Sequence, residues 1–154
     1  MRTSYYEYGI ELKYYQIRTK NPEIVCYNHG NRRYRDSYVA CLNKLGQQSQ
    51  INTRRKQMLK GAQVLLWRPK THVRAYMFMS ASAIIREYDI LPRFQDQWAY
   101  VFKELVYGCL NRAIELNWRY VKLRTPVLDA NFNVFMEDFM KELGCDLFIT
   151  AKNY

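Results

Sequence analysis

A long amphipathic segment between two short apolar runs constrains this chain more than any other feature. Residues 96–117 place apolar side chains at i, i+3, i+4 and i+7, with Lys103, Glu104 and Arg112 on the opposite side. This spacing predicts a helix with one buried face, about 30 Å long at ~1.5 Å per residue. The runs 83–90 and 120–123 that flank it are apolar and β-branched, as strands are. We therefore expect two parallel strands joined by a right-handed helical crossover.

The residues on either side of this unit extend the same sheet. The apolar run 72–91 is several times longer than an ordinary strand, and its small residues Ser80-Ala81-Ser82 permit a bend. We therefore expect an antiparallel meander of strands at 62–67, 73–79 and 83–90. Downstream, Asp129 or Asn131 is expected to cap a helix that runs through Leu143, followed by a last strand at 145–150.

The first 61 residues have a different character. Alternation of apolar and polar residues predicts a strand over residues 4–17, and a shorter strand is expected at 23–27. Asp36 or Ser37 is expected to cap a short helix ending at Gly46, and a second helix is expected at 51–60. The whole chain is thus predicted to be one α/β (α+β) domain, with a mixed, mostly antiparallel twisted sheet around the long helix.

Composition narrows the setting of the protein. A chain of 154 residues that is 49% hydrophobic suits one compact domain. The sequence has no run of 18 apolar residues, so no membrane span is predicted, and the start of the chain lacks an apolar signal core. We therefore expect a protein of the cytoplasm, or one packaged into a particle such as a phage virion, and not a secreted one. The cysteines form no C-x-x-C pair and His29 lies far from His72, so no metal site is expected.

The charge is unevenly distributed. Residues 1–74 hold 15 of the 24 Lys and Arg but only 4 of the 14 Asp and Glu, so the net charge of +10 arises in the first half. A skew of this kind is typical of contact with an anionic partner, although a solvated basic face is the plain alternative. The candidate residues for contact with a DNA phosphate backbone are Arg32, Arg33, Arg35, Arg54, Arg55 and Lys56.

The residues at the start of the long helix resemble a family motif. In GCN5-related N-acetyltransferases (GNATs), a Leu/Val-x-Pro segment leads into a Q/R-x-x-G-x-G/A loop, whose backbone amides hold the pyrophosphate of acetyl-CoA. Residues 90–94 resemble the lead-in, and Gln95 fits the first loop position. Trp98 and Tyr100 occupy the positions of the two small residues, where large side chains prevent close approach of the backbone.

A second family segment is similar to residues 133–145. There Asn133 and Gly144 match the pattern, but Met140 occupies the position of the tyrosine that the family uses as general acid, and a thioether has no proton to donate. Glu87 lies on the strand where some members place a general base, which makes it the one weak base candidate; an ordinary exposed carboxylate is the alternative. The resemblance covers residues 62–150, and residues 1–61 form a divergent, basic N-terminal part of the same domain.

Three functional hypotheses follow. The first is a GNAT-like protein that has lost acetyltransferase activity and serves as a structural or binding component without a cofactor. Such a chain resembles the GNAT-like internal virion proteins of T7-like podophages. This resemblance implies that its partners are other virion proteins or DNA. The second is an active acetyl-CoA-dependent N-acetyltransferase, in which Gln95, Gln97, Trp98, Tyr100 and Asn133 would lie nearest the cofactor. The third is binding of nucleic acid through its phosphates by the basic residues named above.

Overall fold

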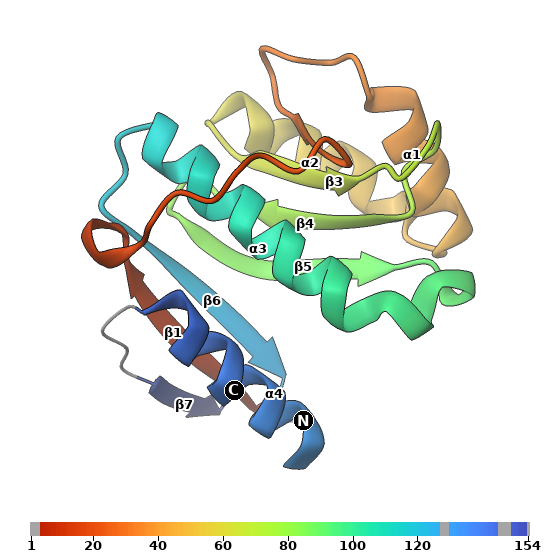
Figure 1. Cartoon of the computed structure of the whole chain (residues 1–154). Coiled ribbons are helices and arrows are strands. Elements are labelled where there is room, and N and C mark those ends of the chain that lie inside the picture. Colours follow the sequence, from red (N-terminus) through yellow and green to blue (C-terminus); the bar gives the residue numbers. More distant parts are fainter. Residues whose placement is uncertain (1–3, 127–129, 145–148, 154) are drawn as a thin grey trace.

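The computed structural model describes residues 4–126, 130–144 and 149–153, which form one seven-stranded mixed sheet with helices on both faces (Figure 1). The strands are β1 (Ser4–Glu11), β2 (Ile24–Tyr27), β3 (Gln63–Trp67), β4 (Ala75–Met79), β5 (Ile84–Ile90), β6 (Tyr120–Pro126) and β7 (Ile149–Asn153). The helices are α1 (Arg35–Lys44), α2 (Ile51–Leu59), α3 (Trp98–Glu115) and α4 (Ala130–Leu143), with 3₁₀ turns η1 (Leu12–Tyr14), η2 (Gln48–Gln50) and η3 (Pro92–Gln97).

The order of strands in the sheet is β2-β3-β4-β5-β6-β1-β7. The expected meander is confirmed, because β3, β4 and β5 pair antiparallel in succession. The expected crossover is confirmed as well, since β5 and β6 are parallel on either side of α3. The first strand, β1, lies between β6 and β7 and is antiparallel to both. The N-terminal strand of the chain is therefore inserted between its two last strands.

Two apolar layers hold the helices against the sheet. Alternate residues of a strand point to opposite faces, so Leu65 and Trp67 of β3 join one core with α3 and α4, while Val64 and Leu66 join the other with α1 and α2. All residues of β3 and β4 are buried, as expected of strands covered on both faces. No helix among the described residues is long and apolar enough to cross a membrane.

The local boundaries correct several expectations. The first strand ends at Glu11 and passes into η1. Helix α1 begins at Arg35 after Tyr34, with no side-chain cap, because the Ser37 hydroxyl instead accepts a hydrogen bond from the Val73 amide of a distant segment (2.9 Å). Asn131 lies inside α4 and does not precede it. The last strand is later than expected, at Ile149–Asn153; residues 145–148 and Asp129 lie outside the described residues.

Candidate functional site

The parallel strands β5 and β6 pair over a short distance and then separate. Their register is limited to Ile84↔Lys122 and Ile85↔Leu123. Beyond this point β5 follows β4 as far as Ile90, while β6 follows β1 as far as Pro126. We call the region between the diverging ends the fork. A cavity of about 680 Å³ lies there and includes Arg86, Glu87 and Tyr88 of β5 and Arg124, Thr125 and Pro126 of β6.

Tyr88 connects the two arms of the fork. Its hydroxyl donates a hydrogen bond to the backbone carbonyl of Arg124 (3.0 Å). Its ring packs edge-on against Phe102 of α3, with ring centroids 5.4 Å apart. Burial raises the pKa of the Tyr88 hydroxyl, so the group stays a neutral donor at physiological pH. One side chain thus bridges the two strands on the α3 face and supplies a hydrogen bond between them.

The opposite face of the fork contains a buried ion pair. The guanidinium group of Arg54 is 3.1 Å from the Glu87 carboxylate and donates to the hydroxyls of Tyr38 (2.8 Å) and Tyr76 (2.9 Å). Only 4% of Arg54 is exposed. Arg54 therefore does not belong to an exposed basic surface, which corrects one residue of the predicted nucleic-acid contact. Glu87 is not an ordinary exposed carboxylate either, because Arg54 and Arg86 both lie against it.

The residues around the start of α3 make their contacts within η3 and with aromatic side chains of α4. The 3₁₀ turn η3 continues directly into α3, and its amides are used within the turn: Phe94 donates to the Leu91 carbonyl (2.9 Å) and Trp98 to that of Gln95. The Trp98 ring lies 4.7 Å from that of Phe135 of α4. Tyr100 is on a different side of α3, where its hydroxyl donates to Glu23 (3.3 Å).

The remaining residues expected near a cofactor are spread out. Gln95 and Gln97 are exposed, Asn133 is half-buried on α4, and Met140 is buried. None of these residues, nor Trp98 or Tyr100, lines the cavity at the fork. The structure therefore does not bring together the set of residues that the family resemblance singled out.

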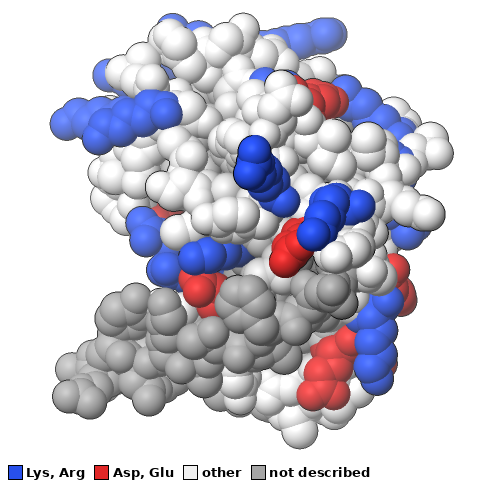
Figure 2. Space-filling view, turned by 90° about the vertical axis from the view of Figure 1, so that its left-hand side faces the viewer, with Lys and Arg blue, Asp and Glu red and all other residues white. Residues whose placement is uncertain are grey.

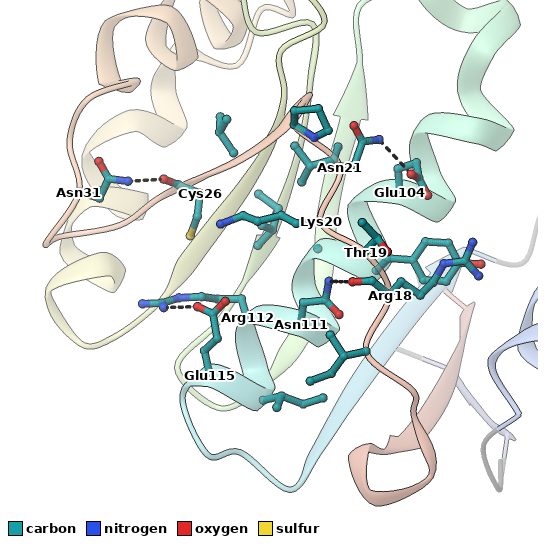
Figure 3. A pocket seen from close by; sticks show the side chains of 18 of the residues that line it. Arg18, Thr19, Lys20, Asn21, Cys26, Asn31, Glu104, Asn111, Arg112 and Glu115 are labelled. Carbon is teal, nitrogen blue, oxygen red and sulfur yellow. Dashed lines mark hydrogen bonds and ion pairs between the residues drawn. The ribbon is translucent and has the colours of Figure 1, made fainter.

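A larger cavity lies on the other side of α3, and we call it the α3 cavity. Its volume is about 1220 Å³. It is bounded by residues 17–22, by β2 and the turn that follows it, and by the C-terminal half of α3 (Figure 3). Its charged residues are Arg18, Lys20, Glu104, Arg112 and Glu115.

The segment over this cavity is attached to α3 by side-chain hydrogen bonds. Asn111 accepts from the Tyr15 hydroxyl (2.7 Å) and donates to the Arg18 carbonyl (3.2 Å). Asn21 donates to Glu104 (2.9 Å), and the Arg18 guanidinium lies 4.1 Å from the centre of the Tyr107 ring. These contacts join residues more than 80 positions apart in the sequence, and only the tertiary structure reveals them.

Of the other predicted basic residues, Arg35 is half-buried and the rest are exposed. Arg35 pairs with Asp36 (3.1 Å), and Arg33 lies over the Tyr34 ring; Arg32, Arg55 and Lys56 are exposed. On the face at the left of Figure 1, Lys and Arg side chains are separated by uncharged surface (Figure 2). Within the described ranges, no group of three or more His, Cys, Asp and Glu could hold a metal ion.

Comparison with known proteins supports the fold. No protein-family model matches the sequence, and no curated protein matches it. Solved structures do match. The fold is that of the GCN5-related N-acetyltransferases. A GNAT-family acetyltransferase from Colwellia psychrerythraea matches with a TM-score of 0.63 and 8% identity, over 99% of this chain and 55% of its own.

Two further structures agree with this assignment. A GCN5-related N-acetyltransferase from Kribbella flavida has a TM-score of 0.57 at 10% identity, over 99% of this chain and 57% of its own. One from Sphaerobacter thermophilus has a TM-score of 0.55 at 9% identity, over 98% and 51%. The chain thus spans little more than half the length of these matches, and identities this low establish the GNAT fold alone.

The buried hydroxyls and thiols of this GNAT fold predict a loss of stability in alkali. Burial raises the pKa of Cys41 to about 11, and it also raises the pKa values of Cys109, Tyr38 and Tyr88. Above about pH 9 the unfolded chain releases these protons first, so its free energy falls relative to the folded state. Each such group is expected to remove about 1.4 kcal/mol per pH unit.

The measurement is urea unfolding at intervals from pH 8 to pH 11. A Cys41→Ala variant serves as the control and should lose stability less steeply than the natural chain above pH 9, since it lacks one of these groups. A stability that stays constant up to pH 11 would contradict the prediction.

Proposed function

We propose that this GNAT-fold protein does not use acetyl-CoA and acts instead as a binding or structural component. The observation that carries the proposal is the contact of Tyr88 with Arg124 across the fork. In GNAT enzymes the acyl-CoA enters between the corresponding strands, which is a property of those enzymes and not of this chain. Here a tyrosine side chain that packs on Phe102 bridges the two strands and borders the space between them.

Two further features support the proposal. A phosphate cradle needs backbone amides that point outward at the start of a helix, whereas the amides of Phe94 and Trp98 are bonded within η3. The Trp98 ring also packs into the aromatic cluster with Phe132 and Phe135. The residues present therefore do not fit acetyl-CoA at this position, and we derive no catalytic step through it.

The proposed role follows from what the chain retains. The described residues keep the sheet and two apolar cores, and the positive charge of the first half favours contact with an anionic partner. The resemblance to internal virion proteins makes an assembly of protein and DNA one setting in which such a component would act. An active N-acetyltransferase is the alternative, and it is tested by the same experiment.

Isothermal calorimetry with acetyl-CoA tests the proposal. We expect no saturable binding at the fork for the natural chain at millimolar cofactor. The Tyr88→Ala variant removes the side chain that bridges the fork, and it should remain folded because the backbone pairing of β5 with β4 between Ile85 and Ile90 does not depend on that side chain. Micromolar binding by the natural chain, together with release of free CoA thiol in the presence of an amine, would overturn the proposal. The matched control is Tyr88→Phe, which keeps the ring but removes the hydroxyl.

A further inference from the structure

The α3 cavity contains a cation that nothing in the described part of the chain neutralises. Lys20 lies on the segment that crosses the cavity, and its side chain extends inward toward Cys26 (Figure 3). The described residues provide no ion-pair or hydrogen-bond partner for its ammonium group. In contrast, the two carboxylates of the cavity are engaged, Glu104 by Asn21 and Glu115 by Arg112. A cation of this kind is available to an incoming anion.

Arg112 supplies a second cation on the facing wall. Its Nη1 group pairs with Glu115 (2.9 Å) and its Nε group donates to the side-chain oxygen of Gln63 (3.1 Å). These contacts leave Nη2 free of described partners. Arg112 lies near the Cys26 thiol because both donate to the side-chain oxygen of Gln63, and the Lys20 side chain extends toward Cys26 (Figure 3). Both cations accordingly oppose the rise that burial causes in the pKa of that thiol. The two cations thus converge on one part of the cavity.

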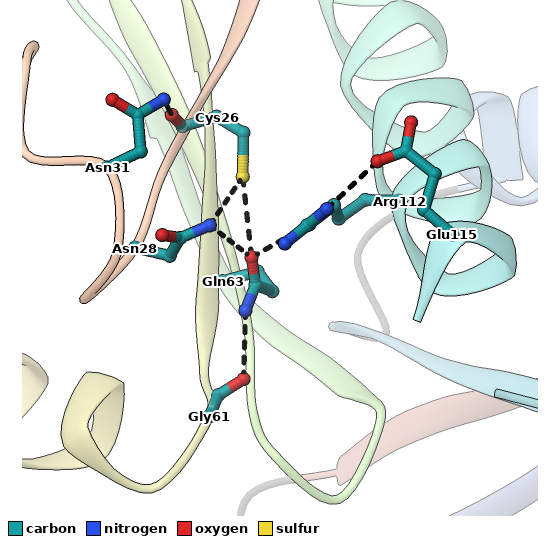
Figure 4. A network of polar contacts seen from close by, with 7 residues as sticks. All are labelled: Cys26, Asn28, Asn31, Gly61, Gln63, Arg112 and Glu115. Atoms are coloured by element: carbon teal, nitrogen blue, oxygen red, sulfur yellow. Dashed lines mark hydrogen bonds and ion pairs between the residues drawn. The ribbon is translucent and has the colours of Figure 1, made fainter. Parts of the chain in front are cut away.

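A buried glutamine holds this wall in place. Gln63 belongs to a strand whose other residues are apolar, and it is only 5% exposed. Its side-chain oxygen accepts from Asn28 (2.8 Å), from Arg112 (3.1 Å) and from the Cys26 thiol (3.5 Å), while its amide donates to the Gly61 carbonyl (3.1 Å) (Figure 4). Burial of a polar group is unfavourable unless its hydrogen bonds are made. Here the full set of bonds fixes Arg112 and Asn28 before any ligand arrives.

We propose that the α3 cavity binds a phosphate group between Lys20 and Arg112. The Nη2 group of Arg112 and the ammonium group of Lys20 can each donate a charge-assisted hydrogen bond to a phosphate oxygen. The volume of about 1220 Å³ exceeds the roughly 300–1,000 Å³ of most small-molecule cavities, so a ligand as large as a nucleotide fits. The phosphate comes either from a free nucleotide or from a single-stranded nucleic acid whose chain runs past the open mouth of the cavity. This site is separate from the fork and does not depend on the proposed loss of acetyl-CoA.

Titration of the full chain with adenosine 5′-monophosphate tests the proposal directly. We expect saturable binding that Lys20→Ala weakens about tenfold, the loss of one charge-assisted hydrogen bond. Lys20 is exposed, so the variant should fold, and its thermal midpoint confirms this. The matched control is Lys60→Ala, which removes an exposed lysine that does not line the cavity. No binding by the natural chain, or equal losses in both variants, would overturn the site.

A second readout needs no variant. A ligand between Lys20 and Arg112 covers Cys26, so saturating nucleotide should slow the alkylation of Cys26. Peptide mapping of the alkylated chain measures this rate. The buried thiols of Cys41 and Cys109 serve as internal references and should stay unmodified throughout. An alkylation rate for Cys26 that is unchanged by bound nucleotide would place the phosphate elsewhere and overturn the assignment.

Two further titrations separate the possible sources of the phosphate and the two sites. A twelve-nucleotide single strand that binds more tightly than the mononucleotide, and loses affinity in Lys20→Ala, would identify a polynucleotide as the source; tighter binding of the mononucleotide would identify a free ligand. Acetyl-CoA also carries phosphates. Acetyl-CoA binding that Lys20→Ala weakens about tenfold belongs to the α3 cavity and supports this site, whereas binding that Lys20→Ala leaves unchanged belongs to the fork and overturns only the proposed function.

Discussion

Replacing Arg54 with alanine is expected to lower the free energy of unfolding by about 3 kcal/mol. The variant removes the charge that faces Glu87 and the donor to the hydroxyls of Tyr38 and Tyr76. Loss of one partner from a buried ion pair costs about 3–5 kcal/mol, because the other charge is left without compensation. The lower end applies here, since about a third of the Glu87 side chain is exposed and water replaces part of the lost interaction. Equilibrium unfolding in urea measures the difference.

The neighbouring residue provides a matched control. Arg55 is the same amino acid on the same helix, but it is exposed, so Arg55→Ala is expected to change stability by less than about 0.5 kcal/mol. A loss below about 1 kcal/mol for Arg54→Ala, or equal losses for the two variants, would show that Arg54 is not held in this network. The comparison therefore tests directly whether Arg54 belongs to the core or to a basic surface.

Replacing Phe139 with alanine is expected to cost still more, about 3–5 kcal/mol. Phe139 of α4 is fully buried. Its ring lies 6.1 Å from that of Phe102 and 5.5 Å from that of Tyr107, both on α3. The substitution leaves a cavity between the two helices that the surrounding aromatic rings fill only in part. Thermal and urea unfolding both report the loss.

Val134 lies on the same helix and is 55% exposed, so Val134→Ala serves as the control and should be nearly neutral. If Phe139→Ala were equally neutral, α4 would not pack on α3 as described. The cluster around Phe139 also includes Phe135, which contacts Trp98. Acetyl-CoA binding by a folded Phe139→Ala variant, absent from the natural chain, would link this packing to exclusion of the cofactor.

Much of the fold could be predicted because its elements carry local signals. The long apolar stripe of α3 predicted the helix, and the small residues between Met79 and Ala83 predicted the turn that makes β4 and β5 a hairpin. Gly46 and Gly144 have φ of +71° and +65°, which glycine adopts without strain, and the expected ends of two helices are confirmed there. The predicted start of α1 was wrong because one candidate cap, Ser37, instead accepts a hydrogen bond from Val73, a residue that is far away in sequence.

The residues of the sites were harder to predict. The family motif drew attention to Gln95, Trp98 and Tyr100, but α3 turns Trp98 and Tyr100 to different sides. The basic cluster Arg54-Arg55-Lys56 looked uniform, yet the helical rotation between neighbours buries Arg54 and exposes the other two. No sequence pattern around Lys20 or Arg112 predicted a binding site. Gln63 did carry one, since a glutamine inside an apolar strand implies a buried hydrogen-bonding role.

The sequence by itself determined the helices, most of the strands and the parallel crossover, because periodicity and turn chemistry act over a few residues and do not depend on distant contacts. Only the tertiary structure decided where β1 inserts, which arginine is buried, that Tyr88 bridges the fork, and that Lys20 and Arg112 line the same cavity. These outcomes depend on residues brought together from positions as far apart in the sequence as Ser4 and Asn153. Local sequence patterns do not specify such long-range contacts. The packing of the whole sheet and its helices specifies them.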